Sequence, residues 1–188
     1  TCALPILKNI LFIIIILLGC LLVACSLLFP IEKMLPGFED IVTFQNSLAK
    51  TTIFMIIYSS ILGPVMEEFV FRGIILGGLL KSHSNKTALL VSTLIFGIMH
   101  IDFAKFVVVS IMGLLLGYLY MKTRSIYLCM LLHGLYNTLS GVVLYYPYNN
   151  ISIDILSTVV GLVFIIFGFK KLIRNINNSN IQKTLNIG

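Results

Sequence analysis

Charged side chains are scarce in this sequence: Asp, Glu, Lys and Arg make up 11% of the 188 residues, while hydrophobic residues make up 59%. Soluble globular domains carry about a quarter charged residues, so this composition excludes an ordinary soluble domain. The sequence predicts a single integral membrane domain over residues 1–188, an all-α polytopic bundle of six transmembrane helices of about 20 residues each. The number becomes seven if one long segment is divided in two.

Several motifs are also missing. The four cysteines show no CxxC spacing and lie mostly in apolar runs, which indicates packing residues and implies no disulfide framework. No HExxH metal-binding motif is present, and no internal repeat of the kind that transporters ordinarily show is visible. The net charge of +6 comes from basic residues at the ends of apolar segments. That pattern orients a protein in a bilayer and gives no case for nucleic-acid binding.

The uncharged runs predict where the helices lie. The expected helices are Leu11–Phe29, Thr51–Leu80, Thr87–His100, Phe103–Met121, Ile126–Tyr146 and Ile151–Phe169. Gly63 and Pro64 interrupt the second segment, which is either one helix kinked at Pro64 or two short helices. We favour the kinked helix, because Thr51–Met66 alone is barely long enough to span. Gly113 and Gly117 have the GxxxG spacing that suits close helix packing.

The segments between and after the helices are polar. Pro30–Lys50 is the one long polar connection, in which we expect a short interfacial helix around Ile41–Ala49. Residues 171–188 form an Asn-rich polar tail. An alternative interpretation of Leu22–Cys25 is a lipoprotein signal cleavage box, but the apolar run continues past it to Phe29.

The basic residues in the connections predict the orientation. With Thr51–Leu80 taken as one helix, one side of the membrane carries nine of them and the other carries three. The nine are Lys8, Lys81, Lys86, Lys122, Arg124, Lys170, Lys171, Arg174 and Lys183, and the three are Lys33, Lys50 and Lys105. Both termini are therefore expected in the cytoplasm.

Three ionisable residues stand in the middle of the segment Thr51–Leu80. Charges at membrane depth are costly and normally face a polar cavity or a partner. Glu68 and Arg72 are four residues apart and can pair on one helix face. Glu67 points about 100° away, so a structural ion pair would leave it unexplained.

Two more predicted helices bring polar residues to a similar depth. Counted from the nearest basic residue on the predicted cytoplasmic side, Glu67, His100 and His133 lie about 21, 21 and 13 Å into the membrane. His133 and Asn137 share one face of their helix. A lone histidine here would be a packing residue, but together these side chains indicate a site.

The residue types suit hydrolysis of an amide. A carboxylate or an imidazole can activate water, and a histidine and an asparagine can donate to the developing oxyanion. A zinc site built from Glu67, His100 and His133 is the alternative, although Asn137 is a poor zinc ligand and a good amide donor. A nucleophilic route through Ser92, Ser110 or Cys129 has no supporting sequence context.

These residues also resemble a known family. Its three ordered motifs appear as Glu67-Glu68-x-x-x-Arg72, Phe96-x-x-x-His100 and His133-x-x-x-Asn137. They resemble the motifs of the CPBP intramembrane proteases, the CAAX protease and bacteriocin-processing (Abi) family, which includes the type II CAAX prenyl endopeptidases. The matching block, 63–144, would be the catalytic core of an all-helical membrane bundle. The many Ile and Asn residues look like those of a bacterial member in the cell membrane.

The resemblance implies a glutamate-dependent endopeptidase that uses no cofactor, although the family is often labelled metalloprotease. It implies a role for each motif residue: Glu67 as the general base on water with His100 assisting, Glu68 and Arg72 as orienting residues, and His133 and Asn137 as the oxyanion hole. The expected partners are membrane lipid and a peptide or protein substrate that reaches the bilayer, of CAAX type or of bacteriocin or leader type.

Two other functions remain open. One is a non-catalytic bacteriocin-immunity or scaffold protein, which would not need an intact acid, base and oxyanion set. The other is a proton-coupled transporter that uses the buried Glu and His side chains as a relay.

Overall fold

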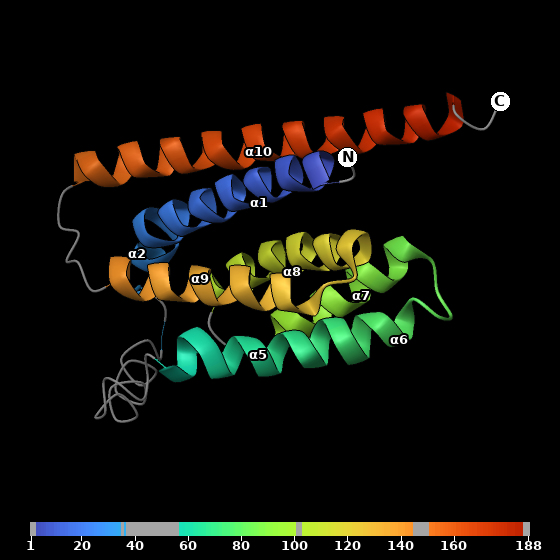
Figure 1. Ribbon diagram of the computed structural model, residues 1–188. Helices are drawn as coiled ribbons and strands as arrows, with labels where there is room; N and C mark the ends of the chain where they lie inside the picture. The colour runs from blue at the N-terminus through green and yellow to red at the C-terminus, as the bar shows by residue number, and fades with distance from the viewer. Residues whose placement is uncertain (1–2, 35, 37–56, 101–102, 145–150, 186–188) are drawn as a thin grey trace.

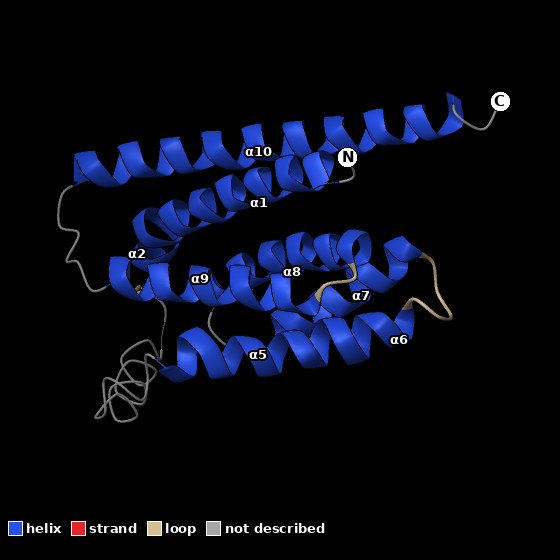
Figure 2. Ribbon diagram, in the orientation of Figure 1, coloured by secondary structure: helices blue, strands red, loops and turns tan. Residues whose placement is uncertain are grey.

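The computed structural model describes residues 3–34, 36, 57–100, 103–144 and 151–185. Within these ranges the chain forms six continuous helical segments and no strand (Figure 2). The segments are α1–η1–α2 (Ala3–Val23, Ala24–Leu28, Phe29–Glu32), η2–α5–η3–α6 (Tyr58–Leu62, Gly63–Glu68, Phe69–Leu76, Gly77–Leu79), α7 (Asn85–Ile98), α8 (Phe103–Thr123), α9 (Ile126–Leu144) and α10 (Ile151–Leu185). The all-α bundle predicted from composition is confirmed.

The predicted helices lie within or close to these segments. The first helix continues past the expected end at Phe29 to Glu32, and a π-helical stretch, Ala24–Leu28, precedes Pro30 in it. The last helix continues past Phe169 through the Asn-rich segment to Leu185. Its 35 residues span about 52 Å, more than the hydrocarbon core of a bilayer. The expected helix around Ile41–Ala49 lies outside the described residues.

The interruption at Pro64 does not divide the second segment. The chain is helical from Ile57 to Leu79, and Gly63 keeps helical dihedral angles (φ −57°, ψ −58°). A π-helical turn precedes the proline, so the Gly63 N–H donates to the carbonyl of Tyr58, five residues back. The wider turn makes room for a residue that cannot donate its own hydrogen bond. The prediction of one helix is therefore confirmed from residue 57 onward.

The helices stack in layers (Figure 1). The first and last helices, α1 and α10, lie side by side, and α1 packs on α8 and α9, while the helix from η2 to α6 lies on the opposite side of α9. α7 packs on α8 and on η3. The first residues of α1 and the last residues of α10 lie toward the end of the bundle that holds the α6–α7 connection.

Glycines set the close contacts between these layers. A Cβ atom on Gly19 would lie 2.6 Å from the carbonyl oxygen of Gly161, so α1 and α10 touch backbone to backbone. A Cβ on Gly117 would lie 2.5 Å from Leu89, and a Cβ on Gly113 would lie 3.0 Å from Thr93. The predicted GxxxG face of α8 is thus the face that packs against α7.

Within the described part of the chain, three helices are long and apolar enough to cross a membrane: Asn9–Leu28, Lys105–Thr123 and Ile153–Asn175. They differ in how far they are enclosed by protein, since 44% of the apolar window of the second is buried but only 11% of that of the third. The exposed apolar face of α10 is what a lipid-facing helix requires.

Candidate active site

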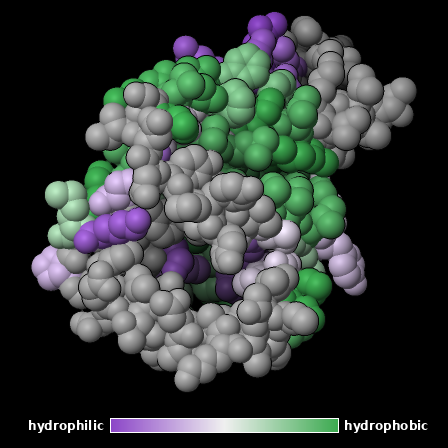
Figure 3. Space-filling model, turned by 90° about the vertical axis from the view of Figure 1, so that its left-hand side faces the viewer, coloured by the Kyte–Doolittle hydropathy of each residue, from purple (hydrophilic) through white to green (hydrophobic). Residues whose placement is uncertain are grey.

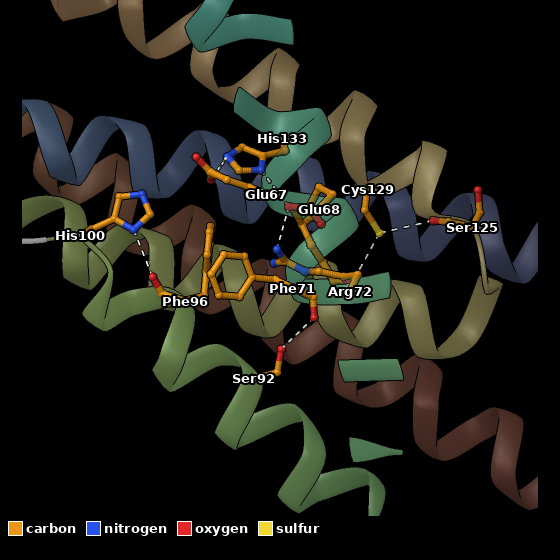
Figure 4. Close-up of polar contacts among 11 residues, drawn as sticks. Glu67, Glu68, Phe71, Arg72, Ser92, Phe96, His100, Ser125, Cys129 and His133 are labelled. Carbon is orange, nitrogen blue, oxygen red and sulfur yellow. Dashed lines mark hydrogen bonds and ion pairs between the residues drawn. The ribbon is translucent and has the colours of Figure 1, made fainter. Parts of the chain in front are cut away.

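Four helical elements place the six candidate residues. Glu67 and Glu68 end α5, Arg72 follows one turn later in η3, His100 lies just after α7, and His133 and Asn137 lie on α9. Figure 4 shows Glu67 and Glu68 facing His133, with Arg72 beneath them and His100 on the other side of Phe96. The structure therefore brings together side chains that are up to 70 positions apart in the sequence.

Glu68 and Arg72 form a buried ion pair. Arg72 Nη1 donates to Glu68 Oε1 at 2.7 Å, and the two side chains are 2% and 0% exposed. Glu68 Oε2 and Arg72 Nη2 are buried without a hydrogen-bond partner among the described residues. The guanidinium instead lies over the ring of Phe96, 4.8 Å from its centroid. The predicted pairing on one helix face is confirmed.

His133 lies between the two glutamates and is 3% exposed. Its Nδ1 is 2.8 Å from Glu68 Oε1, the same oxygen that accepts from Arg72. A carboxylate oxygen accepts hydrogen bonds, here from Arg72 and from His133. The Nδ1 atom of His133 therefore carries a hydrogen and donates it to Glu68. The other ring nitrogen, Nε2, is 3.7 Å from Glu67 Oε2, too far for a direct hydrogen bond.

Glu67 differs from its neighbour in its surroundings. Its side chain is 35% exposed, whereas that of Glu68 is fully buried. Glu67 lines a cavity with His100, His133 and Asn137. The two adjacent carboxylates therefore lie in different surroundings, while the separate roles predicted for them stay a prediction.

His100 is oriented by its own helix. Its Nδ1 is 3.1 Å from the carbonyl oxygen of Phe96, four residues earlier. A carbonyl can only accept, so Nδ1 carries the hydrogen and the neutral ring presents Nε2 as an acceptor. His100 is partly exposed and lines the same cavity as Glu67.

Asn137 is anchored across to the η2 segment. Its Nδ2 donates to the carbonyl oxygen of Ser59 at 2.9 Å, and the second hydrogen of this amide group remains for another acceptor. The two helices approach closely here, since a Cβ on Gly134 would lie 2.4 Å from the carbonyl oxygen of Ser60. Gly134 thus lets His133 and Asn137 reach the glutamates.

The cavity has a volume of about 430 Å³ and two unlike walls. Polar and apolar side chains line it: Ser59, Glu67, His100, Lys105, His133 and Asn137 on one hand, and Leu21, Ala24, Val108, Val109 and Tyr136 on the other. Figure 3 shows a hollow with hydrophilic side chains inside it at one end of the molecule. The apolar wall comes largely from α1 and α8, which carry none of the motif residues.

Sequence reasoning missed several of these lining residues. The distribution of basic residues places Lys105 on the side of the membrane opposite the cytoplasm, the run Leu11–Phe29 predicts a spanning helix that contains Leu21 and Ala24, and no sequence pattern indicates a role for the carbonyl of Ser59. Their sequence gave no signal, because apolar residues in an apolar helix look alike whether they face lipid or a cavity. Only the packing of α1 and α8 against α9 places them here.

The zinc alternative does not fit this geometry. Among the described residues, no three His, Cys, Asp or Glu side chains are grouped so that they could hold a metal ion. The two histidine rings stand on opposite sides of Phe96. We therefore derive no step through a metal.

Comparison with known proteins agrees with the motifs. Residues 49–139 match the family described as Type II CAAX prenyl endopeptidase Rce1-like. "Putative membrane peptidase YdiL" of Bacillus subtilis (strain 168) is 38% identical over 96 residues, which are 51% of this chain and 39% of that protein. "Membrane-embedded CAAX protease MroQ" of Staphylococcus aureus (strain USA300) is 31% identical over 112 residues, 56% of this chain and 44% of that protein.

The matches thus cover about two fifths of the length of these relatives. No solved structure matches this chain. The matched block contains all six candidate residues, and the apolar helices together with the relatives' names indicate an integral membrane protein. The resemblance drawn from the motifs is confirmed: residues 49–139 of this chain are similar to the Type II CAAX prenyl endopeptidase Rce1-like family.

Proposed function

We propose that this protein is an intramembrane endopeptidase that hydrolyses a peptide bond of a membrane-associated protein or peptide. The observation that carries the proposal is the cavity in which Glu67 lies beside two oriented imidazoles and an amide group. The family match over residues 49–139 and the relatives' names support a protease. The CAAX-type substrate named for one relative is one candidate class, and a bacteriocin or leader peptide is another.

In this proposal Glu67 is the general base. It is the partly exposed carboxylate of the pair, so a water molecule can reach it and give up a proton as it attacks the substrate carbonyl. His100 presents the lone pair of Nε2 to the same cavity and assists that proton transfer. Glu68 is buried against Arg72 and His133, and therefore serves to orient them.

His133 and Asn137 are proposed to stabilise the oxyanion. His133 must hold hydrogen on Nε2 to do so, because its Nδ1–H is committed to Glu68. When the ring is protonated, the charges of Glu67, Glu68, Arg72 and His133 sum to zero in this enclosed site. The positive charge of the His133 ring is therefore balanced by a carboxylate on each side of it. Asn137 adds its second amide hydrogen.

The decisive experiment compares membranes of cells that express the wild type or Glu67→Gln. New protein termini that appear with the wild type alone would identify substrates, and a peptide from such a substrate then serves for kinetics on purified protein. Turnover by Glu67→Gln should fall at least about 10²-fold, the low end for general acid–base catalysis. Equal termini in both membranes would contradict the proposal and favour a non-catalytic immunity or scaffold protein.

A metal-free mechanism is part of the proposal. Chelators should leave the turnover of the purified protein unchanged, and elemental analysis should find no stoichiometric zinc. One zinc per chain that is lost together with activity would instead assign Glu67, His100 and His133 as ligands.

We also propose that both termini face the cytoplasm, as the distribution of basic residues indicates. Cysteines introduced at Lys86 and Asn149 should then be labelled from opposite sides of the membrane. Labelling from the same side would contradict this topology.

A further inference from the structure

Phe96 lies at the centre of the candidate site, although its side chain carries no group that could take part in hydrolysis. Its side chain is 1% exposed, and its ring contacts three other rings and one guanidinium group. The His100 and His133 rings stand edge-on to it, at centroid distances of 5.2 and 6.0 Å and interplanar angles of 80° and 83°. The Arg72 guanidinium lies 4.8 Å from its centroid, and the Phe71 ring lies 4.8 Å away.

Both imidazoles are thus held by the same ring. Edge-to-face contact is the arrangement that aromatic rings prefer, because the positive edge of one meets the negative face of another. The face of an aromatic ring also attracts a guanidinium, which here has a buried Nη2 without a hydrogen-bond partner among the described residues. One side chain therefore limits the rotation of two histidines and supports the cation that pairs with Glu68.

The backbone of Phe96 adds a second constraint. Its carbonyl oxygen accepts the Nδ1 hydrogen of His100, which selects the tautomer with a free lone pair on Nε2. The Phe96 ring sets the plane of the His100 ring, and the Phe96 carbonyl sets which nitrogen of His100 carries the hydrogen. His133 has a comparable pair of constraints, from the Phe96 ring and from the Glu68 carboxylate.

We propose that Phe96 is a positioning residue, which sets the separation and ring planes of His100 and His133 so that both Nε2 atoms face the cavity. This inference rests on the proposed function, since it assigns how that site is held in its productive geometry. A residue that only filled space would be replaced adequately by leucine, which packs well in apolar cores. The proposal requires the aromatic ring itself.

Phe71 offers a matched control. It is also a buried phenylalanine, 8% exposed, and it contacts Phe96. Among the described ring contacts it meets neither histidine. Phe71→Leu therefore removes a comparable apolar ring from the same cluster and leaves the two imidazoles in place.

The experiment measures the two histidines directly in purified protein in detergent. Nitrogen-15 NMR of labelled histidine reports the tautomer of each ring, and the sequence has three histidines, of which His83 is exposed and serves as reference. In the wild type we expect His100 to carry its hydrogen on Nδ1 and His133 to show a strongly hydrogen-bonded Nδ1 proton. Phe96→Leu should mix the tautomers of His100 and weaken the His133 signal, while Phe71→Leu should preserve both.

Activity provides the second measurement. Phe96→Leu should lower kcat/KM per folded molecule by about 10- to 10²-fold, the size of effect that small misplacements of catalytic groups produce. Phe96→Tyr keeps the ring and should retain the wild-type tautomers. Phe96→Met, of similar volume, replaces the leucine variant if the latter does not accumulate.

The proposal is overturned if Phe96→Leu or Phe96→Met leaves the histidine spectra unchanged, or if Phe71→Leu alters them as much. If the wild type cleaves no substrate, the proposed function fails, but the spectra still decide whether Phe96 orients the two rings. The two failures are therefore distinguishable.

Discussion

The block from η2 to α9 and the pair formed by α1 and α10 are both built from apolar helices, but they are held together differently. In the first, ionisable side chains are enclosed and engaged with one another, as Glu68, Arg72 and His133 are. In the second, glycines let two backbones touch, as Gly19 and Gly161 do. Few polar contacts join that pair: Ser26 to Thr158 and Asn9 to Asn175 among the described residues.

The difference shows what each part contributes. Enclosed charges tolerate little displacement, because an unpaired charge in a low-dielectric interior is strongly unfavourable. Glycine contacts between apolar helices rely on many weak van der Waals interactions and allow small shifts. The family match runs from 49 to 139, so it covers the charged block and leaves out α1 and α10. Those two helices enclose the block, and α1 supplies part of the cavity wall.

The largest effect is expected when the buried pair is broken. Glu68→Gln removes the negative charge that faces Arg72 and His133 and leaves Arg72 as an unpaired cation, so we expect a loss of about 3–5 kcal/mol in the free energy of unfolding. Thermal unfolding in detergent measures it. Glu67→Gln is the matched control, because Glu67 is 35% exposed, and it should fold normally. Equal losses in both variants would contradict the distinct roles of the two glutamates.

The next effect concerns the approach of α9 to η2. Gly134→Ala would place a Cβ 2.4 Å from the Ser60 carbonyl oxygen. We expect a loss of about 1–3 kcal/mol from overpacking, together with reduced turnover, because His133 and Asn137 move away from the glutamates. Gly141→Ala on the same helix meets nothing within 4 Å and should leave the stability unchanged. If Gly134→Ala and Gly141→Ala are equally stable, the contact between Gly134 and Ser60 does not hold α9 in place.

A similar insertion in the outer pair should act on stability alone. Gly161→Ala would place a Cβ 2.8 Å from the Gly19 carbonyl oxygen, and we expect a loss of up to about 1–3 kcal/mol as α10 shifts. Turnover per folded molecule should stay at the wild-type level, since α10 contributes no residue to the cavity lining. A fall in turnover as large as that of Gly134→Ala would show that the two regions are coupled.

The smallest effect is expected for the polar contact between α1 and α10. Ser26 and Thr158 share a hydrogen bond of 2.7 Å, and Ser26 also donates to the Leu22 carbonyl. Thr158→Val should lower stability by about 0.6 kcal/mol, the average for such bonds between membrane helices. A double-mutant cycle with Ser26→Ala isolates this contact; a coupling energy of several kcal/mol would mean that polar contacts, and not glycine packing, join the pair.

Much of the candidate site could be predicted before the structure. An apolar chain cannot easily place Glu67, Glu68 and Arg72 in mid-segment without a use, and the i, i+4 spacing of Glu68 and Arg72 implied their pairing. The same spacing put His133 and Asn137 on one face. Helix positions followed from uncharged runs, because each run must satisfy its backbone hydrogen bonds internally when it lies in lipid.

The tertiary structure decided what local spacing cannot express. Which nitrogen of His133 faces Glu67 depends on Glu68 accepting from the other, and Phe96 came between the two histidines only when α7 packed against η3 and α8. The apolar wall from α1 likewise depends on a helix far away in the chain. Periodicity along a helix specifies which residues share a face, whereas the partner of that face is chosen by packing over the whole molecule.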